Sequence, residues 1–538
     1  MTRFISTLLM SCTIFCAFAQ FPCNYSNTTE TFEEGDIFLS VAPHRPFTGD
    51  LGIPTQLGTV DTAAVSLWGM LQLGGFTLAG ERRYSGGIFG PSEDYTAGPL
   101  NVDGTAVAAL CQNYDRIWHV RATEIEAHRS DFQDNETVDA PLMNVVKWPG
   151  RGNANLPDLP ELDALHAPFV DLNGNGTYEP LQGEYPDVYG TLAIWSVAND
   201  LGIPNDDTQG TPVGFQIETL LTVPDQDSLP RTVFTEFYLT YRGQEPLQDF
   251  RLGMIHYPPM YCSPMAPGSF PEANLAYLVE AELDPDPNCE FVTSPTEPRR
   301  IFGQQLVSAE RVADGENFNL GSVTFFEQGN SQSAWPPGLW LPEMDVEYYR
   351  NLNGQLRNGF PVGVIDTSIV LQNAVDSFFI FPDTLGWDGC SPTFPMSTYL
   401  INSGVGVGML QPGDEFRVTY ASHLTITPGR ACENRAAVLK TGERVSDYYT
   451  LRQQLITDTE TPTHKIGLVI APNPARGQLQ IQGLSGAVPY RLLSIDGIVV
   501  QSGETDGFVD LDSIPPGMYV LEVWDRFGRR GLERVVVR

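Results

Sequence analysis

The chain has 538 residues, of which 42% are hydrophobic and 11% aromatic, and its 66 Asp and Glu residues against 31 Lys and Arg residues give a formal charge of −35. This composition is typical of a globular protein, and at about 150 residues per domain the length predicts roughly two to four folding units. The charge excludes nucleic acid as a partner and disfavours an anionic membrane surface, because both need clustered basic residues and the only lysines are Lys147, Lys440 and Lys465.

The N-terminus has the pattern of a secretory signal peptide. One charge, Arg3, precedes an uncharged run that closes on Ala17-Phe18-Ala19. We therefore expect residues 1–19 to be cleaved before Gln20. The alternative is lipidation at Cys12, which follows a short lipobox-like stretch. No later segment is long and apolar enough to predict a transmembrane helix, so a secreted or cell-surface protein is expected.

Cysteine and charge usage fit an exported protein. An even number of cysteines remains after the signal peptide, which predicts up to three structural disulfides with connectivity left open. These cysteines are Cys23, Cys111, Cys262, Cys289, Cys390 and Cys432. Abundant Asp and Glu with very little Lys resembles salt-adapted proteins, in which concentrated salt screens the repulsion between carboxylates. We therefore expect a saline habitat.

The body, residues 20–456, is predicted to be mainly β, with long loops and few helices. Residues 232–241 are rich in β-branched and aromatic residues, and similar runs at 214–223 and 250–257 suggest a meander of three strands. Further strands are expected at 275–283, 322–326, 377–381 and 416–427. Helical periodicity is confined mainly to 121–132 and 434–455.

A polar linker is expected at residues 457–465, and a small domain follows at 466–538. Its short apolar runs alternate with turn signals, and Asp496-Gly497 predicts a hairpin turn. About seven strands and this size predict a small Ig-like β-sandwich.

Several landmarks of this small domain occur together and in order. They are Pro472-Asn473-Pro474, Asp496-Gly497 and Gly517-x-Tyr519. In this pattern the segment resembles the C-terminal sorting domain of Bacteroidetes type IX secretion cargo. The resemblance implies passage through the outer-membrane translocon as a partner and removal of the domain near the linker. The alternative is an ordinary Ig-like accessory module.

The body resembles, more loosely, an uncharacterised type of large cargo that carries such a tail. The similar parts are the surroundings of Trp118, residues 171–200, residues 348–354 and the stretch from Pro412 onward. Such proteins often have an Asp-Asp motif after the strand near Phe250, whereas this chain has His256-Tyr-Pro-Pro. The resemblance implies no known activity.

The sharpest local motif is Asp-x-Asn-x-Asn-Gly, which begins at Asp171. It predicts a calcium-stabilised loop, because oxygen ligands at alternate positions followed by glycine suit a hard cation. The predicted ligands are Asp171, Asn173, Asn175, the carbonyl of Thr177 and Glu184. Glu184 is included because position 12 is Gln182, where a bidentate Glu is expected. The alternative is a metal-free Asx/Gly turn.

No catalytic motif is recognisable in the sequence. Zinc-protease, nucleophile-elbow and phosphate-loop patterns are missing, and the glycine-rich run 404–408 is interpreted as a strand twist or bulge. His119 and His128 are interpreted as structural. An aromatic platform for sugars is an alternative to core packing for Trp335, Trp340, Tyr348, Tyr349 and Trp387.

Two functions are left open. The first is a non-enzymatic, calcium-stabilised ectodomain that binds glycan, matrix or protein partners. The second is a secreted polysaccharide- or protein-degrading hydrolase that uses carboxylates. We favour the first, and we expect carboxylates to converge in a cleft only if the second holds.

Overall fold

A computed structural model describes most of the chain. The described residues are 21–26, 28–51, 65–88, 94–160, 165–225, 229–257, 265–280, 299–327, 340–360, 364–366, 369–370, 399–427, 435–457, 469–482, 488–494, 499–524 and 530–538. Several predicted features lie outside these residues: the expected signal peptide, Cys262, Cys289, Cys390, Cys432, Trp335, Trp387, the strand expected at 377–381, nearly all of the expected linker, and Asp496-Gly497.

The body is built on two large antiparallel sheets. The first has the order β1 (Glu30–Glu34), β2 (Ile37–Ala42), β3 (Arg45–Leu51), β4 (Val65–Thr77), β13 (Leu247–Tyr257), β21 (Tyr399–Leu410), β18 (Ser322–Glu327), with β5 (Arg82–Ser85) paired to β4. The second has the order β14 (Met265–Phe270), β15 (Leu275–Glu280), β16 (Arg299–Arg311), β22 (Glu415–Thr427), β12 (Thr232–Tyr241), β11 (Phe215–Val223), β10 (Leu192–Asn199), β6 (Thr96–Ala97). In the same sheet β17 (Glu316–Asn317) pairs with β16, and β7 (Trp118–Arg121) pairs with β10.

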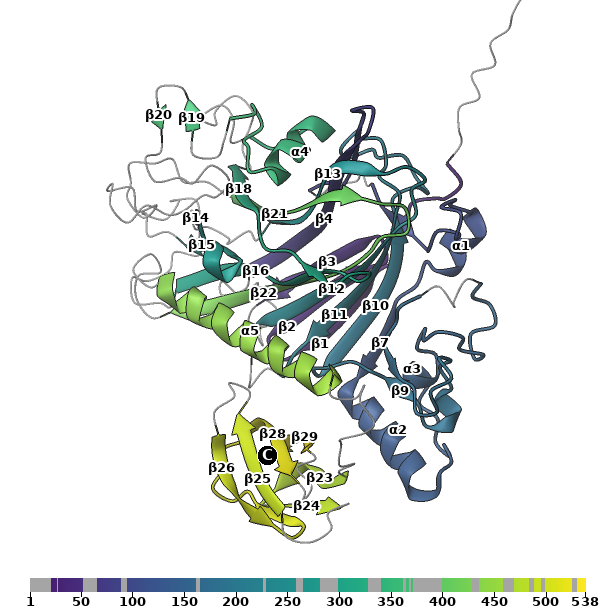
Figure 1. Ribbon diagram of the computed structural model, residues 1–538, viewed down its shortest axis with the longest axis vertical. Coiled ribbons are helices and arrows are strands. Elements are labelled where there is room, and N and C mark those ends of the chain that lie inside the picture. The colour runs from purple at the N-terminus through teal and green to yellow at the C-terminus, as the bar shows by residue number, and fades with distance from the viewer. Residues whose placement is uncertain are drawn as a thin grey trace, which may run out of the picture.

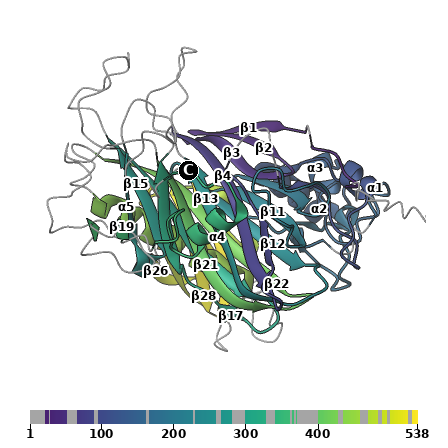
Figure 2. The same ribbon diagram turned by 90° about the horizontal axis from the view of Figure 1, so that it is seen from above.

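The two sheets form a sandwich with the largest hydrophobic core between them. Alternate residues of the central strands, such as Leu252 and Met254 on β13 and Val418 and Tyr420 on β22, contribute to one cluster. Figure 2 shows β1 to β4 along one side of the body, with β11 and β12 beside them. The prediction of a mainly β body with few helices is confirmed.

The predicted three-strand meander is wrong in one respect. β11 and β12 pair as expected, but β13 belongs to the other sheet and the second partner of β12 is β22. The connection after Tyr241, which includes Gly243 and Pro246, carries the chain from one sheet to the other. Because both faces of β12 are buried, its sequence contains no sign of which strand lies beside it.

Helices cover the outer faces of the sandwich. They are α1 (Ala108–Asn113), α2 (Ala122–Asn135), α3 (Met143–Val146), α4 (Asp345–Leu352) and α5 (Arg435–Thr457), with short 3-10 turns at Pro180–Gln182 and Pro271–Ala273. Figure 1 shows α5 lying across the strands of the second sheet. α4 packs on the first sheet through Tyr348 and Tyr349, which are buried, so these two rings are core residues rather than a sugar platform.

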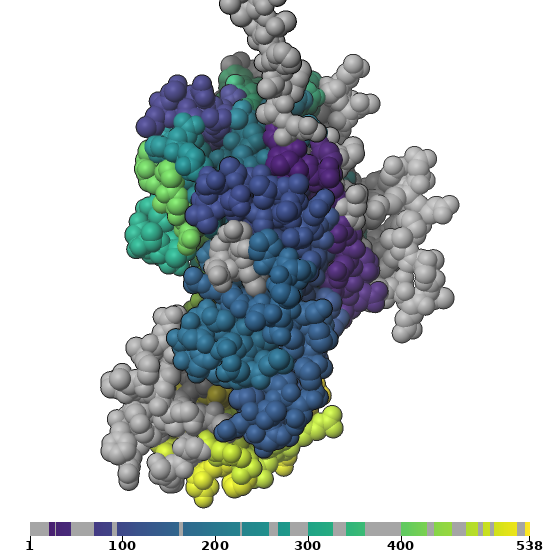
Figure 3. Space-filling model, turned by 90° about the vertical axis from the view of Figure 1, so that its right-hand side faces the viewer, coloured from purple at the N-terminus to yellow at the C-terminus, as the bar shows by residue number. Residues whose placement is uncertain are grey.

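A third cluster lies between the second sheet and the chain from residue 107 to 188. Trp195 and Tyr238 project from the sheet, and Trp148 and Tyr178 meet them from the covering segment. Within this segment β8 (Phe169–Val170) pairs with β9 (Tyr185–Pro186). Figure 3 shows this segment in blue on the face of the molecule, with the C-terminal domain below it in yellow. A further two-stranded sheet consists of β19 (Val364–Asp366) and β20 (Ile369–Val370).

The C-terminal domain has seven strands and its own core. The order is β26 (Val499–Thr505), β25 (Val488–Ser494), β28 (Gly517–Trp524), β29 (Arg530–Val537), β23 (Val469–Arg476), β24 (Gln478–Gln482), β27 (Phe508–Asp510). Alternation places Leu479 and Ile481 inside, where they meet Leu521 and Val535. The expected small β-sandwich is confirmed.

The first pair of cysteines forms a disulfide. Cys23 and Cys111 are bonded across a sequence separation of 88 residues, and the bond fixes the N-terminal segment to α1. A structural role was expected for the cysteines, and this pair confirms it. No helix among the described residues has the length and hydropathy that a bilayer crossing requires.

Candidate functional site

A pocket opens beside β7, where the second sheet meets the covering segment. β7 pairs with β10, and its side chains alternate, so that Trp118 and Val120 are buried and His119 and Arg121 are half-buried. Trp118 enters the cluster under the covering segment, whereas the neighbouring Ile117 enters the core between the sheets. At residues 117 and 118 the chain therefore places side chains on both faces of the second sheet.

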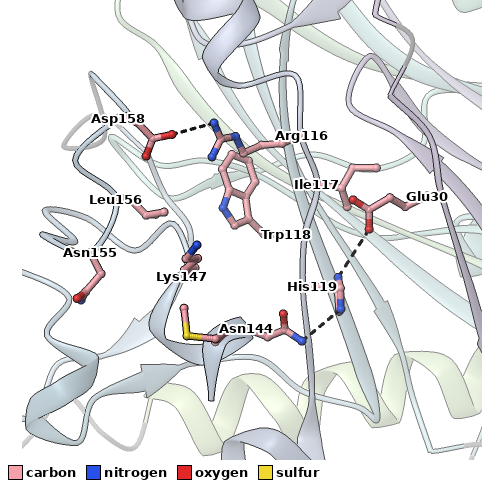
Figure 4. A pocket seen from close by; sticks show the side chains of 11 residues that line it. Glu30, Arg116, Ile117, Trp118, His119, Asn144, Lys147, Asn155, Leu156 and Asp158 are labelled. Carbon is pink, nitrogen blue, oxygen red and sulfur yellow. Dashed lines mark hydrogen bonds and ion pairs between the residues drawn. The ribbon is translucent and has the colours of Figure 1, made fainter. Parts of the chain in front are cut away.

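The pocket has a volume of about 290 Å³ and a mixed polar and aromatic lining. Its walls come from β1, β7, α3 and the loop after Trp148 (Figure 4). The lining residues are Glu30, Arg116, Ile117, Trp118, His119, Met143, Asn144, Lys147, Asn155, Leu156 and Asp158. A concave site with a few convergent polar groups is the usual form of a small-ligand site.

Arg116 and Asp158 form one ion pair on the wall. The guanidinium of Arg116 donates to Asp158 Oδ2 at 3.0 Å, and it lies over the ring of Trp118 at 5.9 Å from the centroid. The hydrogen bond from Arg116 lowers the pKa of Asp158. Asp158 is therefore ionised at neutral pH. It does not have the raised pKa that a general acid needs.

His119 is held by Asn144 and faces Glu30. The amide of Asn144 donates to His119 Nε2 at 3.3 Å and to Glu124 at 2.8 Å, which leaves the proton on His119 Nδ1. This nitrogen lies 3.9 Å from a carboxylate oxygen of Glu30 (Figure 4). The interpretation of His119 as structural stays a prediction, and its ring also lines the pocket from the edge of the sheet.

His128 has the structural role that was expected. It is buried on α2, and its Nε2 lies 3.1 Å from the carbonyl oxygen of Glu184. Burial lowers the pKa of His128, so the ring is neutral and joins α2 to the chain beneath the predicted calcium loop.

The Asp171 loop has the internal hydrogen bonds that its sequence predicts. The carboxylate of Asp171 accepts the backbone N–H groups of Gly174 and Gly176, each at 2.7 Å, and these bonds lower its pKa. Asn173 Oδ1 accepts the N–H of Asn175, and Asn175 Oδ1 accepts the N–H of Thr177. One charged and two amide oxygens therefore sit at alternate positions of a tight turn.

Glu184 closes the base of this loop through hydrogen bonds. Its two oxygens accept the N–H groups of Leu172 at 3.1 Å and Glu179 at 2.7 Å, and the side chain is fully buried. Burial raises the pKa of Glu184. No group of three or more His, Cys, Asp or Glu side chains lies at metal-binding spacing in the described residues. A cation here would therefore need the Asn173 and Asn175 oxygens and the Thr177 carbonyl as well as Asp171.

The loop is linked to the pocket by Tyr178. The phenol of Tyr178 donates to the carbonyl of Val145 in α3 at 2.8 Å, and its N–H donates to Arg151 at 2.7 Å. Val145 lies between the pocket residues Asn144 and Lys147. The position of the loop therefore fixes the helix that forms one wall of the pocket.

The described residues of the predicted sorting motif hold β23 to the rest of its domain. Asn473 donates to the carbonyl of Arg534 at 2.7 Å and accepts the N–H of Val536 at 2.8 Å. Pro472 and Pro474 flank it on β23, each after a cis peptide bond. Gly517 begins β28, and Tyr519 on the same strand donates its hydroxyl to the carbonyl of Pro515 at 2.8 Å.

Sequence reasoning missed most of the pocket. Glu30, Trp118 and Asp158 are far apart in the chain, and no local pattern joins them. One signal was present, since Lys147 is one of three lysines in the chain. A rare residue type would have been a reason to examine its surroundings.

No family model matches the chain, and no curated protein matches it. A solved structure described as a polysaccharide lyase aligns with 64% of this chain and 39% of its own length, at 10% identity and a TM-score of 0.19. The chain thus corresponds to well under half of that protein, and so low a TM-score supports no conclusion about function.

Proposed function

We propose that this protein is exported by a type IX secretion route and that its body is a non-enzymatic binding ectodomain, with the pocket beside β7 as its glycan-binding site. The observation that carries the binding role is the pocket itself. It combines part of the Trp118 ring with charged and amide groups that hold one another in place. The polar groups suit the hydroxyls of a sugar, and the aromatic ring suits its apolar face.

The two carboxyl groups of the pocket lining, Asp158 and Glu30, favour binding over hydrolysis. A glycosidase needs one carboxyl with a raised pKa to protonate the leaving oxygen. In this pocket the ion pair with Arg116 lowers the pKa of Asp158. Glu30, the second carboxyl of the lining, faces His119 and is well exposed. The lining thus supplies fixed hydrogen-bonding groups without a proton donor of the required kind.

Calcium has a supporting role in this proposal. Asp171, Asn173, Asn175 and the Thr177 carbonyl would hold the ion, with Glu184 fixing the two ends of the loop. Through Tyr178 the bound loop would stiffen α3 and keep Asn144 and Lys147 in position. The ion supplies charge and rigidity there, and it takes no part in a reaction.

Binding can be tested by retention of the mature protein on immobilised polysaccharides in saline buffer with Ca²⁺. We expect Arg116→Ala to abolish retention, because it frees Asp158 and removes the cation beside Trp118. Arg435→Ala, which removes an arginine from α5 outside the pocket lining, is the matched control. Equal retention of both variants would contradict the assignment of the site.

The secretion route has a separate test. We expect a chain that lacks residues 466–538 to remain in the periplasm of a host with the type IX system, while the full chain reaches the surface or the medium. Unchanged secretion of the truncated chain would contradict the sorting role. The domain has its own hydrophobic core, separate from the core between the two main sheets.

A further inference from the structure

The pocket has hydrogen-bond donors that its own acceptors do not use. The ammonium of Lys147 makes no hydrogen bond or ion pair within the described part of the chain, although the side chain lines the cavity. The chain as a whole has a charge of −35 and only three lysines. Lys147 is near enough to Asp158 to help lower the pKa of that carboxyl, but its ammonium donates to no group among the described residues and is available at the pocket.

A second such donor comes from Trp118. Its side chain is only 7% exposed, yet its indole N–H has no acceptor among the residues that the structure describes. Figure 4 shows the ring edge that bears this nitrogen turned toward the side on which Leu156 and Lys147 lie. The nitrogen itself is not enclosed by the protein, so its N–H is open to the pocket and a ligand acceptor at this point would take its hydrogen bond.

The acceptors of the pocket are arranged differently. Asp158 is engaged by Arg116 at 3.0 Å. Glu30 lies at the other end of the lining, beside His119 (Figure 4). The end formed by Lys147, Trp118 and Arg116 thus offers donors, and the end formed by Glu30 offers an acceptor for hydroxyl groups.

Resting on the proposed function, we propose that the pocket selects an acidic sugar residue, with its carboxylate or sulfate group at Lys147 and the Trp118 N–H. The anion would lie beside the Arg116 guanidinium, and ring hydroxyls would reach Glu30 and Asn155. An anion gains charge-assisted hydrogen bonds from such donors, which are roughly twice as strong as neutral ones. A neutral sugar would make no such charge-assisted hydrogen bond with the ammonium.

The test is calorimetric titration of the full mature chain with three soluble tetrasaccharides. The probes are an oligogalacturonate, a sulfated oligogalactan and a neutral cello-oligosaccharide, each titrated in saline buffer with Ca²⁺. We expect an acidic probe to bind at least tenfold more tightly than the neutral one, which corresponds to about 1.4 kcal/mol. The two acidic probes distinguish a carboxylate from a sulfate as the recognised group.

Two variants and one control locate the effect. Lys147→Met should weaken acidic binding roughly tenfold or more, and Trp118→Phe should weaken it by a smaller factor because it removes one N–H and keeps a ring. Lys440→Met, on the exposed side of α5, removes the same charge outside the pocket and should leave affinity unchanged.

The outcomes separate this inference from the proposed function. Unchanged acidic binding by Lys147→Met, or equal binding of the neutral probe, would overturn the selection of acidic sugars and leave glycan binding in place. Failure of all glycans to bind, in this titration and on the immobilised polysaccharides, would overturn both.

Discussion

Two buried histidines should make the protein sensitive to mild acid. His256 lies between the sheets and His423 lies under α5, and neither side chain is exposed. Burial lowers the pKa of His256 from its ordinary value of 6.5 to about 3 and that of His423 to about 4. Both rings are therefore neutral in the folded protein, and both become protonated in the unfolded chain below pH 6.5.

The sign and size of the effect follow from this difference. Protons bind more readily to the unfolded state between pH 6.5 and the folded pKa values, so stability falls as the pH is lowered through that range. At pH 5 each histidine favours unfolding by about 2 kcal/mol relative to a pH well above 6.5, and the two together by about 4 kcal/mol. Asp94 acts in the opposite direction, because burial raises its pKa to about 7. The comparison must therefore be between variants.

Urea unfolding of the wild type and His423→Leu at pH 7.5 and pH 5, at constant ionic strength, measures this effect. Neither ring nitrogen of His423 has a hydrogen-bond partner among the residues that the structure describes, so the variant loses none of their bonds. We expect the wild type to lose about 2 kcal/mol more than the variant between the two pH values. His256→Gln should remove a similar amount, because glutamine can keep the hydrogen bond to Ser422 and does not titrate. Equal pH dependence in all three proteins would refute the lowered pKa values.

Three further predictions concern stability. Replacing Cys23 and Cys111 with serine should cost about 2–4 kcal/mol, because the bond closes a loop with a sequence separation of 88 residues. Urea unfolding without reductant compares the variant with the oxidised wild type, and equal stability of the two would contradict the prediction. Arg452→Met should cost about 3–5 kcal/mol, because it leaves Glu236, its partner at 2.6 Å, buried and unpaired, and adding Glu236→Leu should recover much of the loss. The melting temperature should rise with NaCl, because salt screens the repulsion of a chain of charge −35, and a constant value from low to molar salt would be evidence against salt adaptation.

Local patterns in the sequence were enough to predict single elements. β12 spans the residues that its β-branched and aromatic composition indicates, because such a run fits a buried strand wherever it pairs. The Asp171 turn was also predictable, since the hydrogen bonds that the oxygens of Asp171, Asn173 and Asn175 accept from the backbone span at most five positions. The bulge predicted for the glycine run 404–408 is present where β21 pairs with β13. Gly408 there has a positive φ, which residues other than glycine rarely adopt.

Long-range pairing was not predictable from these patterns. β13 pairs in the other sheet, and because residues 252–256 are buried on both faces, their composition does not indicate which strand lies beside them. The pocket was not predictable for the same reason, because it too depends on long-range contacts. Glu30 comes from the first sheet, Trp118 from the second, and Asp158 from a loop, and they meet only because the two sheets come together at β7.

The most direct test of the central account is to incubate the mature protein with polysaccharides and measure both retention and released products. The account predicts that acidic polysaccharides retain the protein, that Arg116→Ala abolishes the retention, and that no oligosaccharides appear. Release of defined oligosaccharides that stops in Arg116→Ala would contradict it and would identify the pocket as the active site of a hydrolase or lyase.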